Sequence, residues 1–322
     1  MKHPSLYVLI FLLVTVSGEA QQSLSPRDSV SLTLDTNVVS VNYGRPSMRG
    51  RKIMGDLVPW DKVWRTGANE ATHFKTNFDM VIGGVPVPRG TYTLWTIPSP
   101  NGWKLILNKQ TKQWGTGYEE FQDLARFDAE VTTLEKPVEQ FTIALEKTGD
   151  ASGTLQLMWE NTLVSTRFEK SNTIRPISPL DSTEALLGGG RVFIKYSKPF
   201  MRGRNIWGVL VPMDSIWRTG ANQATVFSTE KSLTIGDKDI PTGTYTLYSL
   251  PRNGSFELII SKKAPGSAQY DPTMDLVRVA MVMKESEKTI DPFTIQLESS
   301  GETGSLSLGW ENRVYTVRLS VK

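Results

Sequence analysis

The sequence predicts an all-β protein made of two tandem antiparallel β-sandwich domains of jelly-roll-like type. Three observations lead to this fold class. Apolar residues alternate with polar ones, Gly, Pro and Asn separate the alternating runs, and the second half of the chain repeats the first. Alternation places apolar side chains on one face of a strand. Many short strands separated by such turns are typical of sandwiches and jelly rolls.

The repeat is clearest in a ten-residue stretch that occurs twice. VWRTGANEAT spans 63–72, and IWRTGANQAT spans 216–225, 153 positions later. The longer segments 43–72 and 196–225 align without a gap and are identical at 20 of 30 positions. A period near 150 residues is too long for a solenoid, so the pattern indicates a duplicated domain.

Alternating runs recur at matching positions in both copies. The run 30–34 alternates strictly in the first copy. The stretch 118–131 looks helical at first, but its counterpart has large apolar residues at every second position, at Val277, Val279, Met281 and Met283. Both stretches are therefore predicted to be strands. Counting such runs gives eight or nine strands in each copy.

The N-terminus has the pattern of a secretory signal peptide over 1–20. Charged residues precede an apolar run at 6–16, and small residues follow up to Ala20. The apolar run is shorter than the ~20 residues that a spanning helix needs. No cysteine follows that could carry a lipid, and no later stretch is apolar enough to span a membrane. We expect an exported protein, periplasmic or secreted, that is cleaved after Ala20.

The rest of the chain is long enough for two domains of ordinary size. The first domain is predicted over 29–170, and a divergent second domain over 185–322. Between them, 171–184 is rich in polar residues and contains Pro176 and Pro179, which is typical of a linker.

Composition excludes several classes of function. The net charge is only +3, so a nucleic-acid partner is not expected. The chain has no cysteine and two histidines, of which His3 belongs to the predicted signal. With His73 alone, a structural zinc site or a His-rich catalytic zinc site cannot be built within one chain. We expect no metal and no cofactor, and the phosphate-cradling P-loop pattern is absent.

Arginines surround the repeated stretch, whose central part we call the WRTGAN motif (Trp64–Asn69 and Trp217–Asn222). Arginine presents a planar fork of donors that suits carboxylate or phosphate, and tryptophan packs well on apolar sugar faces. A small anion or an envelope glycan would suit such a site. The candidate ligand-binding residues are Arg49, Arg51, Arg65, Asn69 and Trp114 in the first copy and Arg202, Arg204, Arg218 and Asn222 in the second.

Two alternatives stay open at this point. In a structural interpretation, Trp64 anchors the core and Arg65 pairs with Glu160 or caps carbonyl groups. In a catalytic interpretation, the protein hydrolyses a glycan with two carboxylates that flank the sugar bond. The candidate acids are Glu70, Glu160 and Asp61, of which the last two recur as Glu311 and Asp214, whereas Gln223 replaces Glu70. Glu70 as general acid would confine activity to the first domain.

The motifs resemble bacterial domain-of-unknown-function family 2911. In the first copy the resemblance rests on the segments 44–53, 55–59, 63–72, 88–94, 113–115 and 159–160. The second copy departs from the pattern, with Gln223 in place of the glutamate and Lys263-Ala264-Pro265 in place of Gln-Trp-Gly. The resemblance implies an exported protein with a β-rich domain and supplies no reaction. The leading hypothesis is a non-catalytic ligand-binding or interaction module of the cell envelope.

The signal pattern makes a prediction about the mature N-terminus. Mass spectrometry of the natively produced, exported protein should find a chain that starts at Gln21 or at its pyroglutamate, because a signal peptidase cuts after small residues. An exported pool that retains Met1 would contradict the signal assignment.

Overall fold

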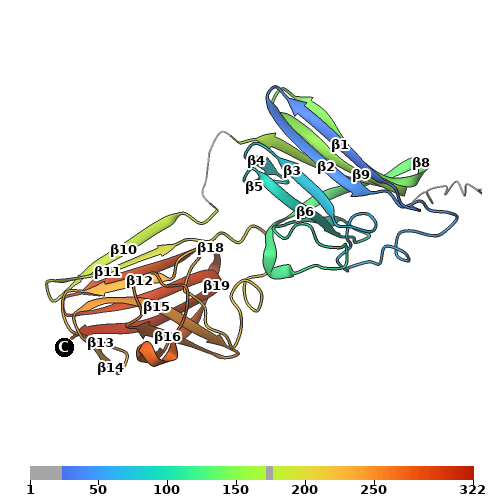
Figure 1. The fold of residues 1–322 in the computed structure, drawn as a ribbon. Helices are drawn as coiled ribbons and strands as arrows, with labels where there is room; N and C mark the ends of the chain where they lie inside the picture. Colours follow the sequence, from blue (N-terminus) through green and yellow to red (C-terminus); the bar gives the residue numbers. More distant parts are fainter. Residues whose placement is uncertain (1–23, 172–176) are drawn as a thin grey trace, which may run out of the picture.

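The computed structural model describes residues 24–171 and 177–322. The predicted signal peptide and 172–176 of the predicted linker lie outside the described residues. The described chain forms two antiparallel β-sandwich domains, which lie side by side in Figure 1. Its only helical turns are two 3-10 segments, η1 (Glu120–Gln122) and η2 (Pro272–Met274). No helix in the described part of the chain is long and apolar enough to cross a membrane.

The first domain contains nine strands in one continuous antiparallel sheet, ordered β1-β2-β3-β6-β7-β8-β9-β4-β5. The strands are β1 (Arg27–Leu34), β2 (Asn37–Gly44), β3 (Thr72–Thr76), β4 (Met80–Ile82), β5 (Val85–Val87), β6 (Gly90–Ile97), β7 (Trp103–Asn108), β8 (Asp123–Gly149) and β9 (Ser152–Lys170).

The long strand β8 belongs to both layers of this sandwich. Its first part pairs with β7, up to the pair Trp103 and Ala129. Its second part pairs with β9, from Glu130 opposite Ser165 onward. A strand that changes partner in this way carries the sheet round the corner, so the two layers face each other across one core.

The second domain repeats this architecture with a break at the corner. Its six-stranded sheet is ordered β10-β11-β12-β15-β16-β17, and its four-stranded sheet β14-β13-β19-β18. The strands are β10 (Leu180–Leu187), β11 (Gly190–Ser197), β12 (Thr225–Thr229), β13 (Leu233–Ile235), β14 (Lys238–Ile240), β15 (Gly243–Arg252), β16 (Ser255–Ser261), β17 (Asp275–Ala280), β18 (Val282–Ser300) and β19 (Thr303–Val321).

Two local features differ from the simplest interpretation of the sequence. In the strands predicted for 118–131 and 277–283, the last apolar residues are not buried. Val131 is 38% exposed and Met283 is 48% exposed. Both lie where the chain passes from one layer to the other, so the buried face of the strand changes there. In addition, strand β10 begins at Leu180, within the segment expected as a linker.

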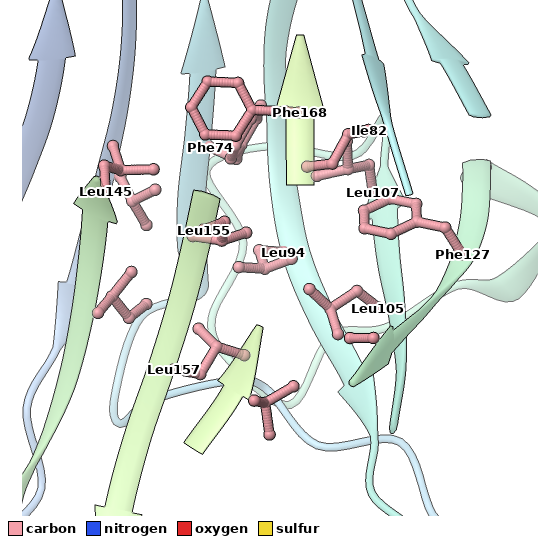
Figure 2. Packing of buried hydrophobic residues seen from close by; sticks show 14 of the residues in the cluster. Phe74, Ile82, Leu94, Leu105, Leu107, Phe127, Leu145, Leu155, Leu157 and Phe168 are labelled. Atoms are coloured by element: carbon pink, nitrogen blue, oxygen red, sulfur yellow. The ribbon is translucent and has the colours of Figure 1, made fainter. Parts of the chain in front are cut away.

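The core of the first domain lies between its two layers. Phe74 and Leu94 come from one layer and Phe168 and Leu155 from the other, and all four are at most 1% exposed. Figure 2 shows these side chains packed together between the strands. Burying an aliphatic or aromatic side chain of this size contributes roughly 1.5–3 kcal/mol. The second domain has an equivalent core of its own.

The WRTGAN motif lies on the long connection between β2 and β3 and is anchored by buried groups. The backbone of Trp64 exchanges hydrogen bonds with Thr96 on β6, with N···O distances of 2.7 and 3.0 Å. Thr66 is fully buried, and its carbonyl accepts a 2.6 Å hydrogen bond from Thr72 Oγ1. Thr225 donates the same bond to Thr219 in the second domain. The motif is thus a fixed part of the fold in both copies.

This anchoring predicts the effect of removing one hydroxyl. Thr72→Val keeps the shape of the side chain but leaves the buried Thr66 carbonyl without its donor, which costs about 1–3 kcal/mol of unfolding free energy. Thr36→Val is the matched control, because Thr36 is exposed, and we expect a change of about 0.5 kcal/mol or less. Both are measurable by urea denaturation. Equal effects at the two positions would contradict a structural role for the Thr66–Thr72 hydrogen bond.

Candidate functional site

A groove of about 650 Å³ lies beside the WRTGAN motif of the first domain, and we call it the first groove. The tryptophans Trp64, Trp95 and Trp159 contribute to its apolar lining, and all three are at least 91% buried. The groove is also lined by the basic side chains of Arg51 and Arg65. No aspartate or glutamate is among its lining residues. The groove therefore places cationic donors beside an apolar floor to which largely buried tryptophan rings contribute.

Arg65 is the central polar group of the first groove. Its Nε donates to the Gly67 carbonyl at 3.3 Å, which confirms the expectation that it caps a carbonyl group. The expected ion pair with Glu160 is absent, since Arg65 forms no ion pair within the described residues, and its terminal nitrogens have no hydrogen-bond partner there. Glu160 instead accepts the Met54 N–H with its Oε2 at 3.1 Å. The guanidinium fork of Arg65 thus remains available to a ligand.

Gly115 packs closely against the aliphatic part of the Arg65 side chain. Its N–H donates to the Asn69 carbonyl at 2.9 Å. A Cβ at this position would lie 2.5 Å from both Arg65 Cδ and the Asn69 carbonyl oxygen, so only glycine permits the close approach. The Asn69 side chain is exposed, and its Nδ2 lies 3.5 Å from the Ser25 carbonyl.

The backbone of the motif is strained at the same two positions in both domains. Thr66 and Asn69 have φ values of 52° and 64°, and Thr219 and Asn222 have 56° and 60°. A positive φ is costly for a β-branched threonine and milder for asparagine. Such strain persists only where the surrounding structure enforces it, and it concentrates at functional sites.

Glu70 and Trp114 lie beside the first groove and do not line it. Their backbones form an isolated antiparallel bridge, which brings the two features that distinguish the first copy next to each other. The Trp114 side chain is 56% exposed. The Glu70 carboxylate is 61% exposed and lies 3.8 Å from the Arg27 guanidinium. This contact is a long surface ion pair, of a kind that contributes little to stability.

The other two candidate acids lie elsewhere. Glu160 is bound to the Met54 backbone, as described above. Asp61 lines a separate groove of about 1240 Å³, together with Asp128 and two further acidic residues. The Asp128 carboxylate is 86% exposed and pairs with Lys104 at 2.6 Å, which is typical of solvated surface charge. The structure does not bring the three candidate acids into one groove.

Arg49 and Arg51 belong to an exposed loop, and both donate hydrogen bonds to backbone carbonyl groups. Arg51 donates from Nε to the Met48 carbonyl at 3.0 Å and from Nη2 to the Ser47 carbonyl at 2.7 Å. Arg49 donates from Nη2 to the Leu24 carbonyl at 3.1 Å. Only Arg51 reaches the first groove.

The equivalent groove of the second domain lies against the first domain, and we call it the second groove. Its volume is about 1000 Å³, and it is lined by Arg204, Trp217, Arg218, Asn222 and Trp310 together with a first-domain segment that includes Glu120, Phe121 and Gln122. Arg218 also donates to its own loop, but it uses a terminal nitrogen: its Nη1 donates to the Asn222 carbonyl over 2.7 Å, whereas Arg65 donates from Nε. One terminal nitrogen of Arg218 is therefore already bound.

Arg202 and Arg204 are buried between the domains, being 8% and 9% exposed. Burial, with a further contribution from the neighbouring Arg202, lowers the pKa of Arg204 to about 10. Both guanidiniums remain charged at neutral pH, and both donate to backbone carbonyls of the first domain. These two candidates are interface residues.

A polar network on the first-domain side of this interface was missed in the sequence. Asp123 Oδ2 accepts hydrogen bonds from Tyr118 at 2.8 Å and from Arg126 Nε at 2.7 Å, and Arg126 Nη2 also donates to Tyr118. The second domain has the same network at Tyr270, Asp275 and Arg278. The signal was present as the repeated spacing Tyr-x4-Asp-x2-Arg.

His73 is half-buried on β3, as its strand position predicts. Burial lowers the pKa of His73, and the Arg27 guanidinium, 3.4 Å from Nδ1, lowers it further. The imidazole is therefore neutral at neutral pH. Within the described ranges, no group of three His, Cys, Asp or Glu side chains is placed to hold a metal ion.

Comparison with known proteins supports the duplication. A family model described as "Protein of unknown function (DUF2911)" matches residues 25–168 and again residues 178–319. Searches of curated proteins and of solved structures found no match.

The surroundings of Glu70 predict a small effect of removing its charge. Glu70→Gln, which copies Gln223 of the second domain, should change the free energy of unfolding by about 0.5 kcal/mol or less, because the carboxylate is exposed. Asp123→Asn is the contrasting variant, since the Asp123 carboxylate is 1% exposed and bound to Arg126, and it should be several times more destabilising. Denaturant unfolding measures both, and a loss at Glu70 as large as at Asp123 would contradict the surface assignment.

Proposed function

This chain belongs to the DUF2911 family, whose domain it carries twice, and from its site we propose that it is a non-catalytic, exported ligand-binding module. The first groove takes a small anion or an acidic glycan of the cell envelope. Arg65 binds the negative group, and the aromatic surface around it supports the body of the ligand.

The observation that carries this proposal is the charge of the first groove. Two arginines line it, no carboxylate does, and the terminal nitrogens of Arg65 have no partner in the described part of the chain. An arginine fork that is held in place but not yet bound suits a planar carboxylate, because two parallel N–H···O bonds can form at once. A few convergent polar groups on an apolar lining are characteristic of small-molecule sites.

The two copies support the same interpretation by their differences. The second groove keeps two of the three tryptophans, but a terminal nitrogen of its Arg218 is bound to its own loop and a first-domain segment forms one of its walls. The first domain alone has the exposed Trp114 beside its groove. We therefore assign ligand binding to the first domain.

Glycan hydrolysis is the weaker alternative. A glycosidase needs two carboxylates about 5–10 Å apart on either side of the sugar bond. Glu160 is bound to a backbone N–H, Asp61 lines a different groove, and Glu70 lies outside the first groove. No such pair is supported in the first groove.

Export remains part of the proposal because it rests on the sequence pattern of 1–20. An envelope location would place the protein beside acidic polysaccharides. It would also suit a chain without cysteines, which needs neither disulfides nor a reducing compartment to stay folded.

Binding can be tested on the full chain by calorimetric titration with citrate and with a uronic-acid disaccharide. We expect binding by the unaltered protein and a loss of at least about tenfold in affinity for Arg65→Met, since a charge-assisted hydrogen bond contributes about 1.5–3 kcal/mol. Methionine keeps an apolar stem against Gly115.

Arg218→Met is the matched control in the second domain and should bind as the unaltered protein does. A neutral disaccharide serves as the second control and should bind more weakly than the uronic-acid compound. Equal losses at Arg65 and Arg218, or equal affinity for the neutral and acidic sugars, would count against an anion site in the first groove.

A further inference from the structure

The two domains are joined by a small set of specific contacts between a loop and a sheet edge. The loop, Met201–Arg204, belongs to the second domain, and we call it the second MRGR loop. The edge belongs to the first domain and contains Pro86, Asp123 and Arg126. The Arg126 N–H donates to the Arg202 carbonyl at 2.9 Å. Arg202 Nη1 donates to the Pro86 carbonyl at 3.1 Å, and Arg204 Nη1 to the Asp123 carbonyl at 3.2 Å.

Gly203 permits the close approach at the centre of this interface. Its φ is 69°, and a Cβ there would lie 2.4 Å from the Arg126 carbonyl oxygen. Because that atom is backbone, any side chain at position 203 would push the two domains apart.

Each half of this interface is present a second time, and in each case without a partner domain. The first MRGR loop, Met48–Arg51, is exposed at Arg49 and Arg51. Gly50 has a φ of 72°, and a Cβ there would meet nothing within 4 Å. The second edge contains Asp239, Asp275 and Arg278, at the positions of Pro86, Asp123 and Arg126.

The first MRGR loop already has the conformation that the second one has in the interface. Arg49 donates to the Leu24 carbonyl just as Arg202 does to the equivalent Ile177 carbonyl. Arg51 donates to the carbonyls of Ser47 and Met48, as Arg204 does to those of Phe200 and Met201. The φ values of Arg49 and Arg202, 51° and 52°, also agree. In the second MRGR loop, the Nη1 groups of the two arginines donate across the interface. In the first MRGR loop, the Nη1 groups of Arg49 and Arg51 have no hydrogen-bond partner among the described residues.

The second edge has the side-chain arrangement that the first edge has in the interface, and it is exposed. Its Tyr270–Asp275–Arg278 network repeats that of the first edge. The Arg278 side chain is 40% exposed, whereas Arg126 in the formed interface is 8% exposed. Asp275 Oδ1 is buried without a hydrogen bond among the described residues.

Three substitutions distinguish the free loop and edge from the loop and edge that form the interdomain interface. Asp239 replaces Pro86, and its carboxylate, which is paired with Lys322 and accepts from Thr234 Oγ1 at 3.0 Å, would also face Arg49, which favours docking. Pro272 replaces Glu120, which accepts a 2.7 Å bond from Asn205, and Lys52 stands at the position of Asn205. The docked pair thus loses one hydrogen bond, and Arg49 would share the Asp239 carboxylate with Lys322.

We propose that copies of this chain associate head to tail, with the first MRGR loop of one copy docked on the second edge of the next. The new interface repeats the interdomain interface between chains: the Arg278 N–H donates to the Arg49 carbonyl, and the guanidiniums of Arg49 and Arg51 bind the carbonyls of Asp239 and Asp275. Such a contact is heterologous, so it leads to filaments or rings and not to a two-fold dimer. This inference stands whether or not the first groove binds a ligand.

The association is weaker than the contact within the chain. Inside the chain, the linker holds the two surfaces at an effective concentration in the millimolar range, which separate chains reach only when crowded. A second consequence concerns the first groove. In an assembly, the η2 segment of the neighbouring chain would form a wall of the first groove, as the η1 segment does in the second groove.

The test uses sedimentation velocity of the full chain up to about millimolar concentration. The unaltered protein should show an average mass that rises continuously with concentration. Gly50→Asn should weaken this association by at least about tenfold, because a side chain at this position meets open space within one chain but the Arg278 backbone in the assembly. Asparagine tolerates the positive φ.

Gly254→Asn is the matched control, since Gly254 has a φ of 83°, has nothing within 4 Å of a built Cβ, and lies at the turn between β15 and β16. It should associate as the unaltered protein does. Asp239→Arg blocks the edge in place of the loop, by setting two arginines against each other, and should also reduce association.

A mixture of Gly50→Asn and Asp239→Arg chains separates a heterologous contact from any other. One variant keeps a free edge and the other a free loop, so the mixture should form a dimer and stop there. The proposal is wrong if the unaltered protein stays monomeric at all concentrations. It is also wrong if Gly50→Asn or Asp239→Arg alone associates like the unaltered protein, or if the mixture forms no dimer.

Discussion

The structure of each domain depends on a tryptophan of the WRTGAN motif packed between the two layers. Trp64 stacks on Trp159 of β9, with ring centroids 5.9 Å apart, while its backbone is bonded to Thr96 of β6. One residue thus fixes a long irregular connection to both sheets. Trp217 and Trp310 repeat the arrangement at 6.1 Å. Aromatic pairs of this kind contribute about 0.5–1.5 kcal/mol beyond their buried area.

That anchoring decides which residues of the motif face solvent. With Trp64 and Thr66 buried, the intervening Arg65 must turn outward, and the positive φ at Thr66 and Asn69 lifts Asn69 and Glu70 away from the core. The motif therefore combines buried anchoring residues with side chains that face solvent. The motif is identical in the two copies, whereas the exposed residue that follows it differs, being Glu70 in the first copy and Gln223 in the second.

Much of the fold could be predicted from the sequence, because alternation reports directly on burial in a two-layer structure. The β10 boundary could not, since the polar segment before Leu187 alternates only weakly and gains its order by pairing with β11. The candidate site was harder to predict from the sequence. Arg65 and Asn69 do meet at one groove, but Glu160 serves the Met54 backbone and Arg202 serves the interface. Residue type and spacing do not reveal which partner a side chain will find across the chain.

Duplication gives the two MRGR loops one sequence and two environments. A glycine that the interface requires at position 203 is, at position 50, a glycine with open space around it. Among the described residues nothing packs against a Cβ built at Gly50, and its positive φ of 72° would also be accessible to asparagine. The same holds for the Nη1 donors of Arg49 and Arg51, which the loop positions but does not use. The first MRGR loop thus keeps the geometry of an interface that it does not form within the described chain. A partner outside the chain best explains this geometry. The surface that fits the loop is the second edge, which lies on the other domain of the chain.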